Sequence, residues 1–343
     1  MKKYVTVWDF LSIGNSHKNF NIEFVRHLER RGVVCQICPS DFRADFFSQE
    51  TQNAFQKLVW LAPLLRSVKF LWHVVFSSQR NYIILAVDNF FGLAALVIAT
   101  VIRPQKAIFC CLHNNYMTLS RSPVRQKIVR YLSKNKIHYF TLGRSPQKDF
   151  SSLGIPTMLV LHPLPDQPIK KSTDREGIAV VGRGNIQPLS AFPELRILLE
   201  SNFRESKLYV LRASPLHDEL ISSGWSVRNL CFYDKPQVSK DYFEFISARA
   251  AILLPEVYDS RGSVSGILLD ALALSVPVLS YRQNILSDIF GDSFKGFIPR
   301  NEKDACEMDI ESVLEGINEG TELAKSNYLD LQKRNFDSFV DSI

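Results

Sequence analysis

The sequence lacks the features of several common protein classes. Its six cysteines in 343 residues show no framework spacing, which indicates a reducing compartment rather than a disulfide scaffold. Cys35 and Cys38 form a C-x-x-C, but no second pair and no nearby histidine cluster completes a zinc site, so packing explains them better. Residues 14–17 read G-N-S-H and lack the full G-x-G-x-x-G pattern, which counts against a nicotinamide enzyme.

Long hydrophobic runs are also scarce. The first ten residues have too short an apolar run for a signal peptide, and Asp9 interrupts it. The most membrane-like stretch, 83–102, contains Asp88, Asn89 and Gly92. A transmembrane span is one interpretation of it. A buried strand over 82–87 followed by an apolar helix over 90–102 explains it better.

Acidic residues are distributed unevenly along the chain. Residues 1–165 carry 21 Lys and Arg against 8 Asp and Glu, whereas residues 166–343 carry 20 against 27. Segment 54–80 combines five Trp and Phe residues with four Lys and Arg and has no acidic residue. We therefore expect an anionic partner for the first half and contact of segment 54–80 with a membrane surface. A helix pair packed on a sheet is the alternative. Because no nucleic-acid motif accompanies the basic residues, no nucleic-acid partner is expected.

Strand and helix patterns alternate through both halves of the chain. Strands are predicted at 4–8, 33–38, 82–87, 107–112, 137–142, 177–181, 207–211, 230–233, 251–254 and 276–280, and helices at 19–31, 90–102, 123–133, 192–200, 238–249, 264–274 and 302–339. This pattern predicts an α/β protein with two Rossmann-like domains facing each other across a cleft. A proline-rich linker at 161–171 separates a basic N-terminal domain, 1–165, from a C-terminal domain, 166–320. Residues 321–343 are predicted to form a helix that returns to the first domain.

Ligands of open α/β sheets bind beyond the carboxyl ends of the strands, so residues directly after strands are the candidates. Asp88 and His113 follow two strands of the first half and are the candidate catalytic residues. A helix cap is the alternative role for Asp88, and a structural role is the alternative for His113. Gly14, in the loop after the first strand, is a candidate contact of the donor. Arg183 follows a strand of the second half, where a guanidinium can pair with phosphate.

Residues 251–280 contain the most informative pattern, a strand, a polar loop and a helix. Small residues, including Ser263, Ser265 and Gly266, lie where the loop leads into the helix. The free amides and positive dipole of a helix start suit a phosphate group. Asp270 follows one turn later and could hold sugar hydroxyls. This combination fits a nucleotide sugar.

Several of these motifs resemble GT-B glycosyltransferases, particularly the family-4-like group that builds bacterial surface polysaccharides. The similar motifs are Val181-Gly182-Arg183, Phe192-Pro193-Glu194-Leu195, Phe232-Tyr233-Asp234, Asp270-Ala271 with Pro277-Val278, and Leu112-His113-Asn114. The resemblance implies that Ser265 and Gly266 bind the diphosphate and that Asp270 binds the ribose. It also implies that Arg183 neutralises phosphate and that His113 lies beside the donor sugar and the attacking hydroxyl.

The chain departs from this family at three positions. The first Glu of the family's paired signature falls on Gly262 here, so we expect its donor-sugar contact to be either absent or moved to Glu256 or Asp259. The second Glu is Asp270. The Lys that usually follows V-G-R is absent, and Arg212 or Arg261 takes over its charge. These departures leave open whether the reaction retains or inverts the anomeric configuration.

From these residues we expect a cytoplasmic glycosyltransferase bound peripherally to the inner face of the cytoplasmic membrane. It would move a hexose-type sugar from a UDP- or GDP-sugar to a hydroxyl of a lipid-linked oligosaccharide or surface polysaccharide. No cofactor or metal ion is expected, because amides and arginines stabilise the departing diphosphate. The alternatives are a nucleotide-sugar epimerase and a non-catalytic nucleotide-sugar-binding protein of the same fold.

Overall fold

The computed structural model of the chain describes residues in several stretches. They are 2–10, 18–38, 62–87, 90–112, 116–134, 137–164, 175–181, 197, 207–222, 229–234, 239–254, 265–281, 284–291, 294, 296 and 301–343. These residues fall into two compact units, the first made from 1–163 and 330–343 and the second from 164–259 and 265–329. None of the described helices is both long and apolar enough to cross a membrane.

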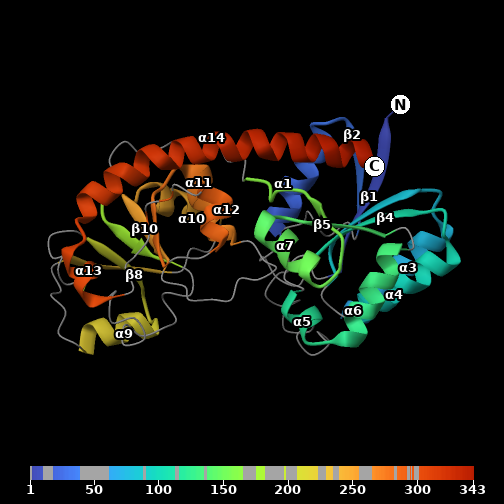
Figure 1. Cartoon of the computed structure of the whole chain (residues 1–343), viewed down its shortest axis with the longest axis horizontal. Coiled ribbons are helices and arrows are strands. Elements are labelled where there is room, and N and C mark those ends of the chain that lie inside the picture. Colours follow the sequence, from blue (N-terminus) through green and yellow to red (C-terminus); the bar gives the residue numbers. More distant parts are fainter. Residues whose placement is uncertain are drawn as a thin grey trace. The chain divides into compact units, whose positions relative to one another are not determined.

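The first unit is a six-stranded sheet covered by helices on both faces (Figure 1). Its elements are β1 (Lys3–Asp9), α1 (Lys18–Glu29), β2 (Val33–Cys38), α3 (Ala62–Phe76), β3 (Asn81–Ala86), α4 (Phe90–Ile102), β4 (Ala107–Cys111), α5 (Tyr116–Ser120), α6 (Pro123–Lys134), β5 (Ile137–Thr141), α7 (Arg144–Ser152), β6 (Met158–Leu159) and the end of α14 (Ile310–Ser342). All neighbouring strands are parallel, in the order β2-β1-β3-β4-β5-β6.

Local sequence signals explain where several of these helices begin and end. Helix α1 stops before Gly32, whose φ of +75° is the left-handed conformation that glycine adopts at low cost after a helix. Helix α6 begins at Pro123, because a proline at the first helical position loses no internal hydrogen bond. The hydroxyl of Ser122 accepts a hydrogen bond from the Arg125 amide at 3.4 Å and so caps this helix.

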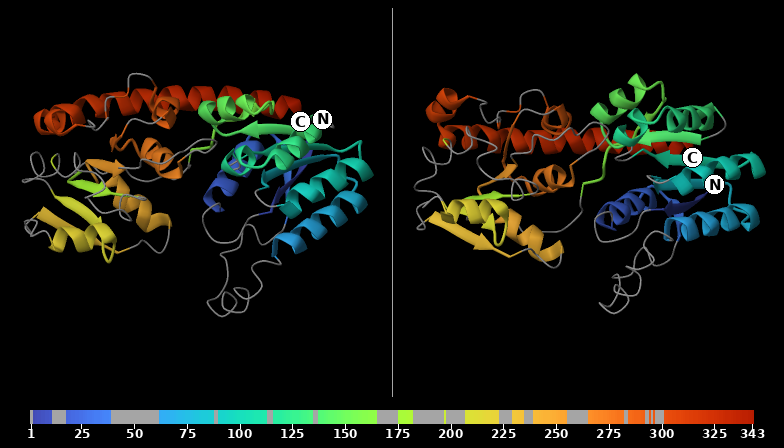
Figure 2. Two further views of the ribbon diagram at one scale, coloured as in Figure 1. Left: turned by 60° about the horizontal axis from the view of Figure 1, so that its bottom comes forward. Right: turned by 90° about the horizontal axis from the view of Figure 1, so that it is seen from below.

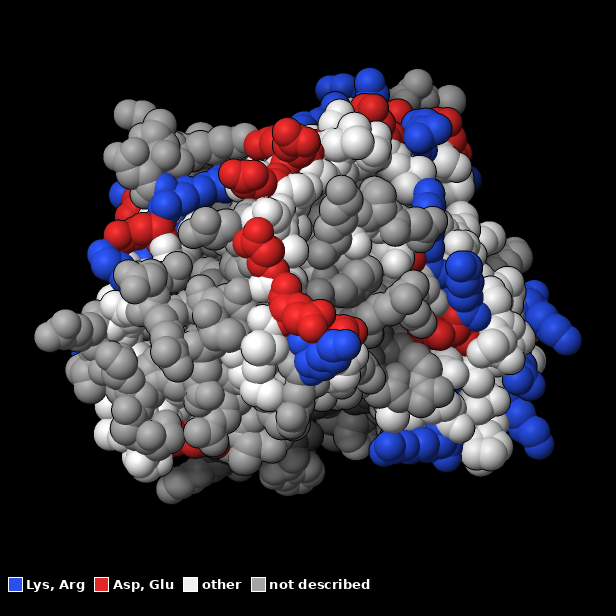
Figure 3. Space-filling model, turned by 60° about the vertical axis from the view of Figure 1, so that its left-hand side comes forward, with Lys and Arg blue, Asp and Glu red and all other residues white. Residues whose placement is uncertain are grey.

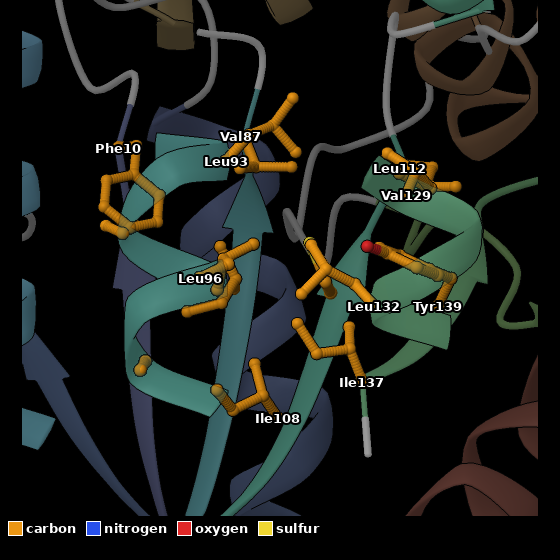
Figure 4. Packing of buried hydrophobic residues seen from close by; sticks show 14 of the residues in the cluster. Phe10, Val87, Leu93, Leu96, Ile108, Leu112, Val129, Leu132, Ile137 and Tyr139 are labelled. Carbon is orange, nitrogen blue, oxygen red and sulfur yellow. The ribbon is translucent and has the colours of Figure 1, made fainter. Parts of the chain in front are cut away.

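Alternate residues of the strands pack on opposite faces of the sheet, as the two-residue period of a strand requires. On one face, Ile108, Ile137 and Tyr139 receive the inner sides of α4 and α6, and α3 packs on the same cluster. Figure 4 shows Leu96 of α4 and Leu132 of α6 directed toward these strands. The packing leaves the outer sides of α3, α4 and α6 as the surface of this layer.

The opposite face is covered by α1 and by the end of α14. Phe339 of α14 lies edge-on to Phe109 at 5.5 Å between ring centroids and contacts Phe140 at 5.0 Å. Phe336 contacts Phe24 of α1 at 5.3 Å. The last residues of the chain thereby complete the core of the first unit.

The second unit is a five-stranded parallel sheet in the order β11-β10-β7-β8-β9. Its elements are β7 (Ile178–Val180), β8 (Leu208–Leu211), α9 (Pro215–Ser222), β9 (Leu230–Tyr233), α10 (Ser239–Ser247), β10 (Ala251–Leu254), α11 (Gly266–Leu274), β11 (Val278–Ser280), α12 (Asn284–Phe290), α13 (Glu302–Glu307) and α14 up to residue 329. Figure 2 shows both sheets from two further directions.

The surface of the second unit is acidic along α13 and the first half of α14. The exposed acidic residues there are Asp304, Glu307, Asp309, Glu315, Glu319 and Glu322. Figure 3 shows Asp and Glu side chains gathered on this side of the molecule. The charge asymmetry of the sequence is therefore also present on the surface of the fold.

The two parallel sheets confirm the predicted α/β fold class, and most predicted strands and helices lie within two residues of their observed bounds. The tail differs from its prediction. A single helix was expected over 302–339, whereas the chain forms α13 and then α14, with Met308 and Asp309 between them. Met308 has an extended conformation. The Asp309 carboxylate accepts hydrogen bonds from the backbone amide of Ser312 at 3.4 Å and from its hydroxyl at 2.7 Å, and the bond from the amide is the one that a capping side chain makes at a helix start.

Candidate functional site

The topology of the second sheet marks one place as its expected ligand site. β7 is followed by β8 and β9 on one side, whereas β10 and β11 lie on its other side, so the strand order reverses between β7 and β10. In open parallel sheets, ligands bind beyond the carboxyl ends of the strands at such a reversal. The chain enters α11 at Gly266 after β10. The start of α11 is therefore the candidate site.

The start of α11 has small residues that leave room for a ligand near its first backbone amides. Ser265 is the extended residue before the helix, and its side chain makes no capping hydrogen bond. Gly266 is the first helical residue, is exposed, and has open space where a Cβ atom would be. Since Ser265 does not cap the helix, the first amides of α11 are free of the usual side-chain partner. A helix start of this kind attracts an anion through its amides and its dipole.

The other end of α11 is held firmly. Ser275 adopts a left-handed conformation with φ 54°. Arg175 donates hydrogen bonds to the carbonyl oxygens of Ser275 and Leu274 at 2.5 and 2.9 Å, and the Lys325 ammonium donates to Ala273 O. These cations satisfy the unpaired carbonyl groups at the negative end of the helix. The apolar side chains of Leu268, Leu269, Ala271 and Leu272 are buried beneath the helix.

Asp270 lies one turn into α11 and is the most perturbed acidic residue in the described part of the second unit. Burial raises the pKa of its carboxyl from 3.8 to about 7, and the nearby hydroxyl of Tyr242 acts in the opposite direction. The residue as a whole keeps intermediate exposure at the surface of the helix. Strongly shifted acidic groups cluster at functional sites, because an uncompensated buried carboxyl lowers stability.

Tyr242 belongs to α10, which packs beside α11. Its hydroxyl is buried and has no hydrogen-bond partner of good geometry in the described part of the chain. The Asp270 carboxyl is nonetheless near enough that its negative charge, together with burial, raises the pKa of Tyr242 well above its usual value. Leaving the buried Tyr242 hydroxyl without a hydrogen bond lowers the stability of the fold. The Asp270 carboxyl is close enough to become its partner after a small shift of either side chain.

Tyr233 links the same group to the sheet. It ends β9, and its hydroxyl donates a hydrogen bond to the carbonyl oxygen of Val180, the last residue of β7, at 2.9 Å. Tyr233 also contributes to the raised pKa of Tyr242. Three elements thus bring Tyr233, Tyr242 and Asp270 together near the carboxyl ends of the strands.

Arg212 directly follows β8, as predicted, and it is paired with an acidic side chain. Its guanidinium Nε donates to an Asp234 carboxylate oxygen at 3.0 Å, and both side chains are exposed. An exposed pair of this kind is worth little, so an incoming phosphate could displace Asp234. Ala213 follows with a φ of 54°, an uncommon value for a residue other than glycine.

The structure gathers only some of the predicted site residues. Ser265 directly precedes α11, Gly266 is its first residue and Asp270 lies one turn later, and Arg212 directly follows β8. The other predicted residues lie outside the described part of the chain: Gly14, Asp88, His113, Arg183, Glu256, Arg261 and Ser263. Ser265 was expected in the first turn of the helix but precedes it.

Sequence reasoning named Tyr233 only as part of the Phe232-Tyr233-Asp234 motif and did not find Tyr242, since a tyrosine in an amphipathic helix is typical of packing. It also missed Asp9, which ends β1 and is fully buried. The Asn21 amide donates a hydrogen bond to the Asp9 carboxylate at 2.6 Å. In the first sheet the strand order reverses between β1 and β3, so this pair lies at the corresponding place of the first unit.

Comparison with solved structures defines the fold as GT-B. The protein HepE from Anabaena, solved with UDP and glucose, has a TM-score of 0.64 and 11% identity over 100% of both chains. The lipopolysaccharide outer core galactosyltransferase WaaB has a TM-score of 0.61 and 13% identity over 99% of both chains. A Listeria monocytogenes protein proposed to be a UDP-N-acetylglucosamine 2-epimerase has a TM-score of 0.53 and 12% identity over 94% of this chain and 90% of that chain. No protein-family model and no curated protein sequence matches the chain.

Proposed function

We propose that this protein is a glycosyltransferase that takes a hexose-type sugar from a UDP- or GDP-sugar. The carrying observation is the start of α11, where uncapped amides, an exposed glycine and the perturbed carboxyl of Asp270 meet at the strand-order reversal. A diphosphate needs amides and positive potential, and a ribose diol needs a carboxylate acceptor. The site offers both. Support also comes from HepE, which has this fold and was solved with UDP and glucose.

In the proposed reaction, an acceptor hydroxyl forms a bond to the anomeric carbon of the donor sugar. The bond between that carbon and the β-phosphate oxygen breaks, and the nucleoside diphosphate leaves with the electron pair. The hydroxyl proton passes to a base or to solvent, and Asp88 and His113 remain the candidate bases. Because negative charge develops on the leaving phosphate, the amides at Gly266 and the dipole of α11 stabilise the transition state.

The fixed rear end of α11 supports this role. Arg175 and Lys325 hold its last carbonyl groups, so the amides at its start need little rearrangement as charge develops. Preorganised donors are worth more than donors that must reorient. We expect Arg183, Arg212 or Arg261 to add positive charge, with Glu256 and Ser263 also contacting the donor, and no metal ion to be needed. Activity that persists in EDTA would support the last point.

The acceptor is proposed to be a hydroxyl of a lipid-linked oligosaccharide or surface polysaccharide. The protein would act in the cytoplasm at the inner face of the cytoplasmic membrane, in the group of family-4-like enzymes that its motifs resemble. The basic surface of the first unit supports an anionic or membrane-bound acceptor.

The test begins with the purified full chain and a panel of UDP- and GDP-sugars. Calorimetry would measure binding, and chromatography with NMR would follow hydrolysis or transfer. We expect one nucleotide class to bind and turn over, and we expect Asp270→Ala to lose at least tenfold in affinity, as expected for a charged hydrogen bond. Asp330→Ala, at an exposed position of α14, is the matched control. Unchanged binding and turnover in Asp270→Ala would remove the basis of the proposal.

An epimerase is the second candidate, because the Listeria protein shares the fold. The two reactions leave different products. An epimerase returns a free nucleotide sugar with one inverted sugar carbon, whereas a transferase releases UDP or GDP. Binding of a nucleotide sugar with neither product would indicate the non-catalytic alternative.

A further inference from the structure

The outer layer of the first unit exposes an unusual number of large hydrophobic side chains. We call the outward sides of α3, α4 and α6 the α3–α6 surface. Its exposed large hydrophobic residues are Leu65, Val68, Trp72, Phe76, Phe90, Phe91, Ile98, Val101, Ile102, Val124 and Tyr131. Single exposed hydrophobic residues need no explanation, but a set on adjacent helices of one layer indicates a partner.

On α3 these residues follow the helix period. Leu65, Val68, Trp72 and Phe76 recur every three or four residues, so they form one stripe on the side opposite the buried Phe70. Trp72 and Phe76 are 68% and 67% exposed, and their rings contact each other at 4.3 Å between centroids. The two rings therefore present a joint aromatic surface to solvent.

Helix α4 repeats the pattern beside α3. It buries Leu93 and Leu96 against the sheet and leaves Ile98, Val101 and Ile102 exposed, with Val101 at 67%. Figure 2 shows α3 and α4 side by side on the first sheet, and the two helices are in contact. Each helix leads back to the start of the next parallel strand, α3 to β3 and α4 to β4, so the two helices run in the same direction. Their last turns therefore lie at the same edge of the sheet. Phe76 and Val101 therefore belong to one end of this layer.

The same surface carries positive charge. Residues 62–134 contain ten Lys and Arg and a single acidic residue, Asp88. Some of these cations serve the fold: Arg66, Arg103 and Lys106 donate to backbone carbonyl groups. Others are exposed and pair with no acidic residue in the described stretches, namely Lys69, Arg80, Arg121, Lys127 and Lys134.

We propose that the α3–α6 surface docks onto an anionic phospholipid bilayer. Aromatic rings sit well at the boundary of headgroups and acyl chains, and aliphatic side chains gain by leaving water. The cations then attract the negative lipid headgroups. The surface includes the described part, 62–80, of the segment already expected to contact a membrane. It extends that segment to α4 and α6, which the sequence did not single out.

Two other partners fit the surface less well. A second copy of the chain would bring two sets of unpaired cations together across a twofold axis, and like charges facing each other weaken an interface. A nucleic acid would use the cations but would gain little from Val101, Ile102 and Leu65. An anionic bilayer uses both the charged and the apolar residues.

The test is flotation of the full chain with vesicles of equimolar phosphatidylcholine and phosphatidylglycerol, compared with pure phosphatidylcholine vesicles. We expect strong binding to the anionic vesicles, weak binding to the neutral ones, and a loss of binding as salt rises. The double variant Trp72→Ser/Phe76→Ser should lose about tenfold or more in partitioning. Ile221→Ser/Leu323→Ser, which alters similarly exposed hydrophobic residues on α9 and α14, should keep the wild-type value.

Charge is tested separately with Lys69→Gln/Lys134→Gln. Each cation near an anionic surface raises the partition coefficient onto vesicles about fivefold, so this variant should bind the anionic vesicles roughly 25-fold more weakly. Lys303→Gln/Lys333→Gln is the matched control. Circular dichroism and thermal unfolding would show that all variants remain folded.

Three results would overturn the proposal. The first is equal vesicle binding by the Trp72/Phe76 variant and its control, and the second is equal binding to neutral and anionic vesicles. The third is a dimer in sedimentation velocity that the Trp72/Phe76 variant dissociates, without vesicle binding, since the surface would then be a self-association interface. Vesicle binding requires no donor, so its failure would leave the proposed sugar transfer intact, and the reverse also holds.

Discussion

Replacing Asp270 by Asn should make the second unit more stable at pH 8 and weaken its nucleotide binding. Burial raises the pKa of Asp270 from 3.8 to about 7, so ionising this carboxyl is harder in the folded protein than in the unfolded chain. Asn has nearly the same shape and carries no charge. The variant therefore removes the cost of ionisation while keeping the packing.

The direction of the pH dependence follows from proton binding. Between about pH 4 and 7, the folded protein keeps a proton on Asp270 that the unfolded chain has lost. Stability attributable to this residue is therefore full below pH 4 and falls as the pH rises to about 7. A shift of about three units corresponds to about 4 kcal/mol at 1.36 kcal/mol per unit. The residue as a whole is not fully buried, so water relaxes around part of the ionised side chain, and we expect about 2 kcal/mol rather than the full value.

The assay is thermal unfolding of the wild type and Asp270→Asn from pH 4 to pH 8.5. The two should unfold at similar temperatures near pH 4, and the variant should be higher by about 4–8 °C at pH 8, given the size of this unit. UDP and GDP titrations at pH 8 should show at least tenfold weaker binding by the variant, because the amide replaces a charged acceptor. Asp330→Asn, on an exposed position, should change neither quantity.

Two outcomes would refute the reasoning. If the stability difference is the same at pH 4 and pH 8, burial of the Asp270 charge is not its cause. If the variant is less stable at pH 8, the carboxylate makes interactions in the folded state that outweigh its desolvation. If the stability changes as expected but the nucleotide affinity does not, burial of the Asp270 charge is supported and its role in nucleotide binding is refuted.

Three further predictions follow from described contacts. Tyr242→Phe removes the hydroxyl that lowers the pKa of Asp270, so this pKa should rise and the pH at which nucleotide binding reaches half its maximum should rise with it, as measured by calorimetry across pH. Phe339→Ala should destabilise the first unit by about 3–5 kcal/mol in urea unfolding, because Phe339 is buried among aromatic rings, whereas Leu323→Ala on an exposed turn of α14 should cost less than 0.5 kcal/mol. Lys106→Met leaves the carbonyl groups of two loop residues without their donor and should cost about 1–3 kcal/mol by the same assay. A Phe339→Ala loss as small as that of Leu323→Ala would contradict the packing of α14 on this sheet.

The sequence predicted the framework well where apolar runs were bounded by clear breaks. The strand before Leu112 and the helix from Phe90 were both found, because continuous apolar residues next to Asp88 or after a turn allow few other structures. Short amphipathic helices such as α9 and α12 were missed, since fewer than ten residues give too few repeats of the helix period.

Only those residues of the candidate site that lie close together in the sequence could be predicted. Ser265, Gly266 and Asp270 could be found because they lie close together in the sequence where a loop leads into a helix, and one helix turn separates Gly266 from Asp270. Tyr242 could not, because its approach to Asp270 depends on how α10 rotates against α11, and apolar periodicity does not fix that rotation to a single residue. The predicted strand 4–8 stops before Asp9, whereas β1 includes it. The burial of Asp9 depends on Asn21, twelve positions later in the chain.

The stability of α11 and its proposed function place opposite demands on the helix. Its rear end satisfies its carbonyl groups through Arg175 and Lys325, and its underside is buried. At that start the protein keeps an uncapped Ser265 and an acid whose ionisation lowers stability at neutral pH. A helix optimised only for folding would have a capping side chain and a neutral residue there. A bound nucleoside diphosphate would meet both needs at once, because its phosphates accept from the free amides and its ribose donates to the carboxylate. The same ligand should therefore stabilise the second unit most at pH values above 7, where Asp270 is ionised and has the most to gain.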